Sequence, residues 1–285
     1  MGATAKTFSG GVAVITGAGA GIGAGLARQA ARLGMKVAAL DISADRLSTL
    51  STELRALGAE VLPIVTDVGV AANLDAAAEQ VHATWGDVRL LINNAGIETI
   101  GNSWEIPAAR WEQTLNVNLH GVIHGVRAFA PRMLASGKPG FIANLASIGA
   151  FGAMPMQTAY ILTKHAVQSF SECLYLEIEL TGKPVRVSTI VPGLVRSEIF
   201  ADTSGESAHA RAHRKAMREM MAAYGMDLDE ACTIILDQVA AGEFWVSTQP
   251  DMTRDMIAGR TAFLSTQSRP ALTPQTKALL ASSDP

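Results

Sequence analysis

The sequence predicts an α/β fold, a doubly wound parallel sheet of about seven strands with helices on both faces. Short apolar runs alternate with longer amphipathic runs along most of the chain, a rhythm typical of βαβ units. The apolar runs hold few polar positions, as strands require when both sheet faces are covered. Hydrophobic residues make up 48% of 285, enough for one large core. We expect a single domain over 8–265 and a loose tail at 266–285.

The first half of the chain supplies four strand–helix repeats. Each predicted strand is short and apolar, and the first predicted helix ends at Gly34, a residue typical of helix ends. The predicted strands are 12–16, 36–41, 61–67 and 89–96, and the predicted helices between them are 21–34, 44–58 and 71–86.

The second half continues the pattern with longer helices. We expect one helix over 104–135, a strand at 141–147, a helix over 157–181 and a strand at 185–193. Residues 197–241 look helical and more charged, and a short strand at 243–248 precedes a last helix over 251–264. The sequence contains no recognisable linker or repeat.

Composition excludes several classes of partner. The net charge of −3 and the absence of a basic stripe argue against nucleic acid. No apolar run reaches the roughly 18 residues of a spanning helix, and the N-terminus lacks an apolar signal, so we expect a cytoplasmic protein without membrane contact. Cys173 and Cys232 are expected to be buried, reduced thiols.

A glycine cluster, Thr16–Gly23, lies between the first strand and the first helix. This is the place where a Rossmann-type fold binds the phosphates of a dinucleotide, because glycines let the backbone approach and the helix N-terminus offers N–H donors. The spacing of Gly17, Gly21 and Gly23 is G-x-x-x-G-x-G. A tight turn without a ligand is the alternative interpretation.

Asp41 ends the second strand, 24 residues after Gly17. A carboxylate there accepts hydrogen bonds from the adenosine ribose hydroxyls and repels a 2′-phosphate. Ala20 supplies no cation for such a phosphate, so the sequence favours NAD over NADP. Arg46 lies one turn into the next helix and complicates the preference. The alternative for Asp41 is a cap of that helix.

Tyr160 and Lys164 are four residues apart on a predicted helix and share one face. An ammonium nearby favours the phenolate, so we expect Lys164 to lower the pKa of Tyr160 and make it a proton carrier. Ser147 ends the preceding strand, where it is able to hold a substrate oxygen. Asn118 lies inside the predicted helix 104–135 and is either solvated or part of a polar network.

In this combination the motifs resemble those of the short-chain dehydrogenases/reductases, over about residues 8–250. The residues that carry the resemblance are TGAGAGIG, NNAG at 93–96, Asn118, Ser147, Tyr160, Lys164 and PG at 192–193. The resemblance implies an NAD(P)-dependent enzyme that interconverts a secondary alcohol and a ketone. Tyr160 is then the general acid/base, Lys164 binds the nicotinamide ribose, Ser147 orients the substrate oxygen and Asn118 holds a water in a proton relay.

The resemblance also implies a set of cofactor contacts. The glycine loop and Asp41 would hold the adenosine half, and the segment after Pro192 would hold the nicotinamide carboxamide. The first Asn of NNAG, Asn93, often braces the central sheet and does not contact a ligand. The full set is Gly17, Ala20, Gly21, Ile22, Gly23, Asp41, Asp67, Val68, Asn94, Ala95, Gly96, Tyr160, Lys164, Pro192, Gly193, Val195 and Ser197.

The substrate should be bound by the variable segments, above all a lid at about 194–226. These segments are rich in Met and Phe, which suit bulky apolar or aromatic groups, although the same residues would also pack a lid onto the body. Residues 242–264 are similar to the corresponding segment of dehydrogenases that act on lignin-derived aryl ethers. The candidate substrate residues are Ile97, Met154, Gln157, Leu194, Phe200 and Met221.

Several alternatives stay open at this stage. The histidine pairs 120/124 and 209/213 have the spacing of zinc ligands but no third ligand, so we expect no metal, the first pair in a packing face and the second on a solvated one. The chain could instead be an NAD-binding sensor or scaffold, an NADPH-preferring carbonyl reductase, or an epimerase or dehydratase, which would need a larger substrate domain. By resemblance we expect a homo-oligomer, a tetramer.

Overall fold

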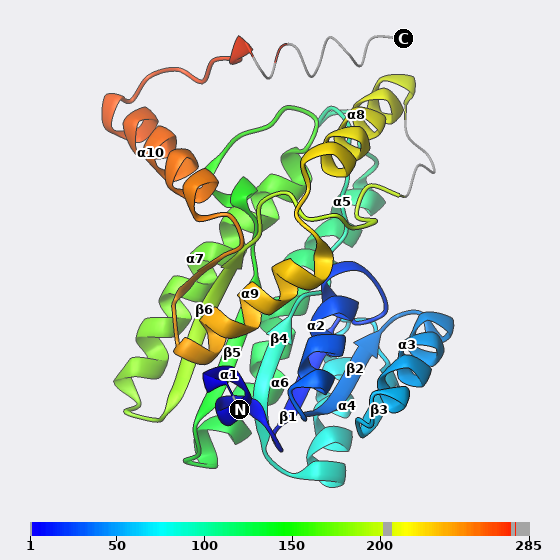
Figure 1. Ribbon diagram of the computed structural model, residues 1–285. Helices are drawn as coiled ribbons and strands as arrows, with labels where there is room; N and C mark the ends of the chain where they lie inside the picture. The colour runs from blue at the N-terminus through cyan, green and yellow to red at the C-terminus, as the bar shows by residue number, and fades with distance from the viewer. Residues whose placement is uncertain (1, 202–206, 275–276, 278–285) are drawn as a thin grey trace.

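A computed structural model describes residues 2–201, 207–274 and 277. Its centre is one parallel sheet of seven strands in the order β3-β2-β1-β4-β5-β6-β7, with helices on both sides (Figure 1). The order reverses beside β1, because β2 follows on one side and β4 on the other. The predicted fold class is therefore confirmed. Ten residues of the predicted tail (275–276 and 278–285) and residues 202–206 of the predicted lid lie outside the described part.

The strands match the predicted ones closely. They are β1 (Val12–Thr16), β2 (Lys36–Asp41), β3 (Val61–Val65), β4 (Val88–Asn93), β5 (Gly140–Leu145), β6 (Val185–Val191) and β7 (Trp245–Ser247). The helices are α1 (Ala3–Phe8), α2 (Gly21–Arg32), α3 (Ala44–Ala56), α4 (Ala71–Trp85), α5 (Ala108–Leu115), the π-helix η1 (Asn116–His120), α6 (Gly121–Ala135), the 3₁₀ helix η2 (Ile148–Phe151), α7 (Thr158–Leu180), α8 (Ala208–Tyr224), α9 (Leu228–Ala241) and α10 (Pro250–Thr266).

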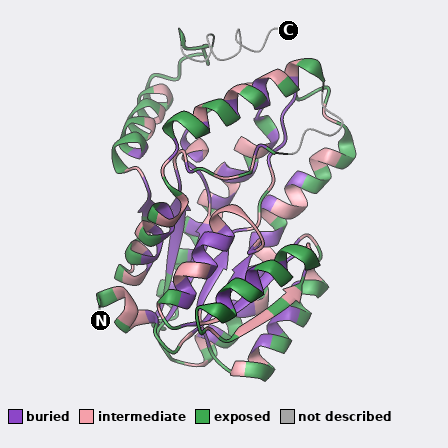
Figure 2. Ribbon diagram, turned by 45° about the vertical axis from the view of Figure 1, so that its right-hand side comes forward, coloured by how far each residue is buried: buried purple, intermediate pink, exposed green. Residues whose placement is uncertain are grey.

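Alternate residues of the strands enter two separate cores. In β1, Ala13 and Ile15 belong to a core formed with α2, α3 and α9, while Val12 and Val14 belong to a core with α4, α6 and α7. The sheet is accordingly buried between two helical layers (Figure 2). At about 25 cal/mol per Å² of apolar surface, these two cores supply most of the driving force for folding.

Two predicted helical segments differ from the observed helices, and one observed helix was not predicted. The predicted helix 104–135 starts only at Ala108, after Pro107, and widens into the π-helix η1 in its middle. The predicted helical segment 197–241 is broken between α8 and α9, because the side chain of Asp227 accepts hydrogen bonds from Asp229 N and Glu230 N and starts a new helix. Helix α1, which packs on α9, was not predicted.

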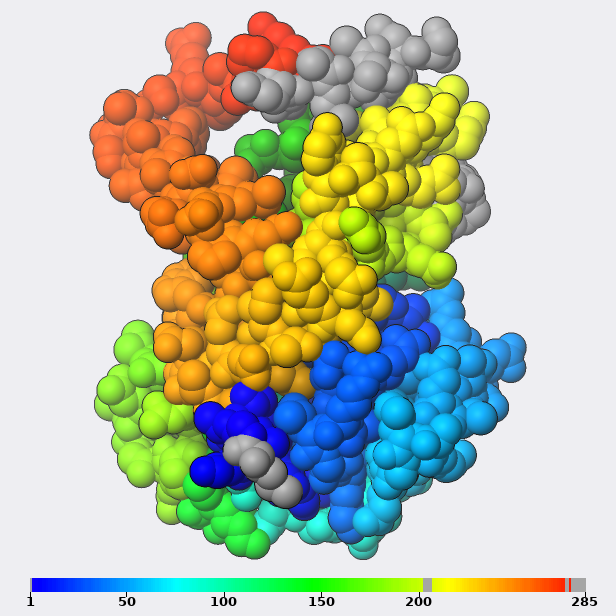
Figure 3. Space-filling view, viewed as in Figure 1, coloured from blue at the N-terminus to red at the C-terminus, as the bar shows by residue number. Residues whose placement is uncertain are grey.

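Two of the later helices lie at one end of the molecule. Helices α8 and α10 stand at the end opposite to α1 (Figure 1). In the space-filling view the yellow α8 and the orange α10 stand apart, and green residues from the middle of the chain show between them (Figure 3). Within the described residues no helix is both long and apolar enough to cross a membrane.

Candidate active site

The glycine-rich loop joins β1 to α2 in a conformation that needs glycine. Gly17 has φ +62°, and a Cβ there would lie 2.7 Å from Ala95 Cα. A Cβ on Gly23 would lie 2.1 Å from Gly17 O. The Asn94 side chain closes the loop from the other side, since its Nδ2 donates to Thr16 O at 2.8 Å and to Gly17 O at 3.1 Å. The loop is therefore a tight, preformed backbone cradle at the start of a helix.

Asp41 lies directly beside this loop. Its Oδ2 accepts a hydrogen bond from Gly19 N at 2.8 Å, and its Oδ1 accepts one from Ser43 N at 2.9 Å. Ser43, not Asp41, is the cap of α3, because its side chain accepts from Arg46 N. Each carboxylate oxygen keeps accepting capacity for a further donor. The capping alternative for Asp41 is thus excluded.

Arg28 and Arg46 also lie beside the glycine-rich loop. Arg28 Nε is paired with Glu53 Oε2 at 2.9 Å, and a Cβ on Gly19 would lie 2.7 Å from Arg46 Cβ. A surface hollow at this point holds both cations beside the glycine loop. The negative charge of Asp41 and the positive charge of Arg46 therefore both lie beside Gly19. The hollow is lined by Gly19, Arg28, Asp45, Arg46, Thr49, Leu50 and Glu53.

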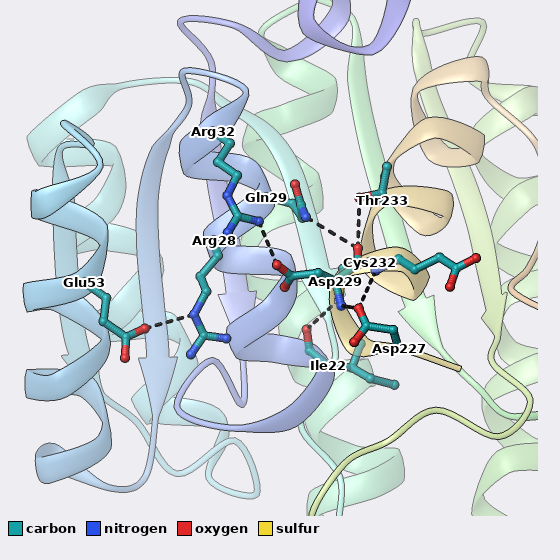
Figure 4. A network of polar contacts seen from close by, with 10 residues as sticks. Ile22, Arg28, Gln29, Arg32, Glu53, Asp227, Asp229, Cys232 and Thr233 are labelled. Carbon is teal, nitrogen blue, oxygen red and sulfur yellow. Dashed lines mark hydrogen bonds and ion pairs between the residues drawn. The ribbon is translucent and has the colours of Figure 1, made fainter. Parts of the chain in front are cut away.

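Helix α2, which starts at the glycine loop, is fixed to α9 by polar contacts (Figure 4). Arg32 Nη1 lies 3.1 Å from Asp229 Oδ2, and Cys232 Sγ contacts Ile22 O at 3.6 Å. A Cβ on Gly25 would lie 2.5 Å from Cys232 Sγ, so the two helices touch backbone to side chain. This close packing holds the N-terminus of α2 in position against the sheet.

The NNAG segment links the glycine loop to the centre of the sheet. Asn93 Nδ2 donates to Asn144 Oδ1 at 2.8 Å, and Asn144 Nδ2 donates to Ser171 Oγ at 3.0 Å. Asn93 therefore braces β4, β5 and α7, the structural role expected for the first Asn. A Cβ on Gly96 would lie 3.6 Å from Asn118 Oδ1 and 3.7 Å from Lys164 Nζ.

Tyr160 and Lys164 share one face of α7, as predicted, above the carboxyl ends of β5 and β6. Lys164 Nζ donates to Leu145 O at 2.7 Å and lies 5.4 Å from the centre of the Tyr160 ring. The Ser147 side chain accepts a hydrogen bond from Gly149 N and also hydrogen-bonds with Tyr160. A hydroxyl, a phenol and an amine therefore converge where the strands end.

The predicted lowering of the pKa of Tyr160 is wrong for this structure. Burial of the phenol raises its pKa, the negative charge of Glu98 raises it further, and the hydrogen bond with Ser147 lowers it only in part. Burial also lowers the pKa of Lys164 to about 8, against the opposing charge of Glu98. The spacing of Tyr160 and Lys164 reveals the nearby ammonium, but it reveals neither the desolvation of the phenol nor the buried carboxylate.

Glu98 is the residue that the sequence argument missed. Its neighbour Ile97 is among the candidate substrate residues and Glu98 is not, although a charged residue among apolar ones after a strand end is a usable signal. It is only 3% exposed. Its backbone oxygen accepts a hydrogen bond from Arg110 Nη2 at 3.0 Å.

Asn118 belongs to a polar network, one of the two predicted possibilities. It is completely buried in η1, and its Oδ1 accepts from Ile97 N at 2.8 Å. Its Nδ2 donates to Ile97 O at 2.9 Å and to Thr163 Oγ1 at 3.2 Å. π-Helical turns are often found at functional sites. Here the wider turn aims an amide at the strand-end loop.

The remaining expected cofactor contacts lie along the same edge of the sheet. Asp67 Oδ1 accepts from Gly69 N at 2.9 Å, and the buried Val68 side chain packs in the core, so only its backbone is available to a ligand. Val195 is buried and forms a bridge with Met226. A Cβ on Gly21 would lie 3.5 Å from Ser197 Cβ, so the segment after β6 meets the glycine loop.

Three of the six candidate substrate residues, Leu194, Phe200 and Met221, lie in one apolar cluster that joins α8 to the strand-end loops. This packing matches the alternative that lid residues pack onto the body. The cluster also forms an apolar wall beside the strand-end loops. Met154 is partly exposed and Ile97 borders the polar network. The cluster contains Ile100, Met156, Phe200, Ala210, Met217 and Met221, with Leu194, Ile199 and Met220 against it.

Several sequence expectations about His and Cys need correction. His213 is buried rather than solvated, because α8 turns Ala210, His213, Met217 and Met221 to one side, whereas His120 is exposed rather than packed. Cys173 is exposed, while burial raises the pKa of Cys232 to about 12 and keeps it a thiol. Within the described ranges, no three His, Cys, Asp or Glu side chains cluster as metal ligands would.

The backbone cradle, the adjacent carboxylate and the polar groups at the strand ends fit a dinucleotide. The short chain dehydrogenase family model matches residues 11–208. Over 241 residues the chain is 32% identical to 1-deoxy-11-beta-hydroxypentalenate dehydrogenase of Streptomyces avermitilis, covering 84% of both proteins. A short chain dehydrogenase/reductase from Burkholderia phymatum, crystallised with NAD, is 32% identical with a TM-score of 0.89, covering 93% of this chain and 98% of that one.

A longer relative matches only in part. The chain is 37% identical over 189 residues to "Probable oxidoreductase EphD" of Mycobacterium tuberculosis, which is 66% of this chain but 32% of that protein. The aligned region thus spans about a third of that relative. This chain belongs to the short-chain dehydrogenase family of oxidoreductases, whose members use NAD or NADP.

Proposed function

We propose that the protein interconverts a secondary alcohol and a ketone, with Tyr160 as general acid/base. The observation that carries this proposal is the convergence of Ser147, Tyr160 and Lys164 at the strand ends, next to the glycine cradle. When bound, a nicotinamide cofactor supplies or accepts the hydride. The chain then has to orient the substrate oxygen and move one proton.

The side chains divide that work. The Ser147 hydroxyl, held by Gly149 N, is positioned to orient the substrate oxygen. The Tyr160 phenol, whose pKa is raised, stays protonated at neutral pH and is able to donate to a ketone oxygen. In the oxidative direction it must first release that proton, which its raised pKa opposes. The Asn118 amide is committed to Ile97 and Thr163, so a relay water would meet its backbone.

We further propose NAD as the preferred cofactor, held by Asp41 and the glycine loop. Support comes from the two Asp41 oxygens, each with one backbone donor and remaining capacity for a ribose hydroxyl. The segments named from the resemblance, around Asn94, Asp67 and Ser197, would hold the rest of the dinucleotide. The nearby Arg46 supports the alternative of an NADPH-preferring carbonyl reductase. Titration of the protein with both cofactors separates the two.

We propose a substrate with a bulky apolar or aromatic part. The apolar cluster around Met217 and Met221 supports this, because methionine side chains adapt to irregular apolar shapes. The reaction itself is tested by Tyr160→Phe, which keeps the ring and removes the proton carrier. Turnover of an alcohol or ketone should fall ~10²–10⁴-fold while cofactor binding persists.

Two results would argue against this function. Full turnover by Tyr160→Phe would exclude the acid/base role. Cofactor binding without turnover of any alcohol or ketone in a broad screen would favour a sensor or scaffold protein.

We also propose a homo-oligomer, a tetramer. Helix α7 exposes Leu162, Leu176 and Leu180, which recur on one face of the helix. Leu176 is 59% and Leu180 89% exposed, so this face is apolar and turned to solvent in a single chain. A second copy is the natural partner for such a face in an oligomeric enzyme.

A further inference from the structure

The loop after β4 fixes a carboxylate that the proposed mechanism does not use. Asn118 bonds both backbone groups of Ile97, the residue before Glu98. On the other side Arg110 donates to Glu98 O at 3.0 Å and to Thr99 Oγ1 at 3.1 Å. The backbone is therefore held before and after Glu98, and this buried side chain sits on a rigid support.

An amide lies on the opposite side, at the start of α7. Gln157 is 5% exposed, and its Nε2 has no hydrogen-bond partner among the residues that the structure describes. Gln157 is the N-cap of α7 and precedes Tyr160 by three residues. The neighbouring Met156 O accepts from Gly101 N at 2.8 Å, which ties this segment to the loop of Glu98. A buried donor left without a partner costs stability, so its presence points to a ligand.

Both groups lie in segments that join the reacting centre to the apolar cluster. The charge of Glu98 acts on both Tyr160 and Lys164, so the carboxylate is within electrostatic reach of the phenol and the amine. Ile100, two residues after Glu98, and Met156, directly before Gln157, both belong to the apolar cluster. An ionised carboxylate only accepts hydrogen bonds and therefore selects for donors.

We infer that Glu98 and Gln157 form a recognition site for a second polar substituent next to the reacting carbinol. The substrate class is a secondary alcohol, or its ketone, that bears a neighbouring hydroxyl or ammonium donor and an apolar remainder. Glu98 accepts from that donor, and Gln157 Nε2 donates to an oxygen of the same substituent or to the reacting oxygen. This inference rests on the proposed function and narrows its substrate.

The test compares three benzylic alcohols with NAD, followed by nicotinamide absorbance: 1-phenylpropane-1,2-diol, 1-phenylpropan-1-ol and 2-amino-1-phenylpropan-1-ol. A site built to bond a hydroxyl rejects the analogue that lacks it, so the wild type should favour the diol or the amino alcohol over the mono-alcohol by about 100-fold or more in kcat/KM. Whichever of the diol and the amino alcohol has the higher kcat/KM identifies the preferred donor as hydroxyl or ammonium.

Variants then assign the preference to the two side chains. Glu98→Ala should bring the ratio to within about tenfold of unity by losing the donor-bearing substrate, mainly through KM. Because the charge of Glu98 also acts on Tyr160 and Lys164, the ratio and not the absolute rate with the mono-alcohol is compared. Glu98→Gln keeps the size and an acceptor, so it should lose the amino alcohol more than the diol. Gln157→Ala should lower the same ratio. Glu112→Gln removes an exposed charge from the adjacent α5 and should change nothing.

The outcomes separate this inference from the proposed function. If the wild type uses the mono-alcohol as well as both the diol and the amino alcohol, or if the ratio is unchanged in both Glu98 variants and in Gln157→Ala, the recognition site is overturned while the dehydrogenase function stands. No turnover of any alcohol or ketone overturns both. Melting curves and cofactor titration show whether each variant is folded, and Glu98→Gln and Gln157→Ala carry the test if Glu98→Ala does not fold.

Discussion

Asn118 offers a direct test of the link between the π-helical turn and the strand-end loop. Asn118→Ala removes three hydrogen bonds, two to the backbone of Ile97 and one to Thr163 Oγ1. A polar group left unsatisfied in a buried site costs about 1–3 kcal/mol. Ile97 is only partly buried, so water relieves some of this penalty, and alanine recovers about 0.5 kcal/mol in helix propensity.

Three partner groups lose a hydrogen bond, so the penalties add before these two offsets are subtracted. The net expectation is a loss of about 2–4 kcal/mol in the free energy of unfolding. The measurement is urea denaturation of the apoprotein, followed by circular dichroism, with an unchanged m-value as the sign that only stability moved. Asn116→Ala is the matched control. It lies in the same helix, and its hydrogen bond with His120 is exposed, so it should cost under about 0.5 kcal/mol.

The functional arm of the experiment uses a temperature at which both variants are folded. Asn118→Ala should lose turnover, because the loop that carries Ile97 and Glu98 is no longer fixed, while cofactor affinity stays within about threefold, because the glycine cradle and Asp41 are untouched. If Asn118→Ala is as stable and as active as Asn116→Ala, the reasoning that this amide holds the site together is refuted.

Three further perturbations address the cofactor, the buried amine and the assembly. Asp41→Ala should lower the preference for NAD over NADP by about tenfold or more in titrations, equal to about 1.4 kcal/mol, and an unchanged preference would contradict the role of the carboxylate. Lys164 has a pKa of about 8 when folded and 10.5 when unfolded. Between pH 8 and pH 10.5 the unfolded chain therefore binds one more proton than the folded chain. The free energy of unfolding of the wild type relative to Lys164→Met should rise by about 3 kcal/mol over that range and be flat below pH 7. A constant difference over that range would exclude the lowered pKa. Leu176→Arg should reduce the oligomer mass in sedimentation, whereas Leu57→Arg at the exposed residue that follows α3 should not. Equal masses for both variants would exclude the α7 interface.

The sequence alone determined the sheet and the positions of the chemical groups along it. Strands buried on both faces are written as uninterrupted apolar runs, so 12–16 and 36–41 were predicted to the residue. The glycine loop was equally readable, because two of its positions admit no side chain. Gly17 has φ +62°, and a Cβ on Gly23 would lie 2.1 Å from Gly17 O. The spacing of Tyr160 and Lys164 placed them on one face of α7, since that depends only on local helix geometry.

Only the tertiary structure decided how these groups affect one another. The pKa of Tyr160 depends on burial and on Glu98, which is 62 residues away in sequence and reaches the phenol only because β4 and β5 are neighbours in the sheet. The π-helical turn that aims Asn118 at Ile97, the cap at Asp227 that divides α8 from α9, and the burial of His213 likewise depend on contacts between distant segments. Local patterns encode the backbone conformation. Electric fields and desolvation arise from all the residues that pack around a group, and the linear sequence does not show which residues these are.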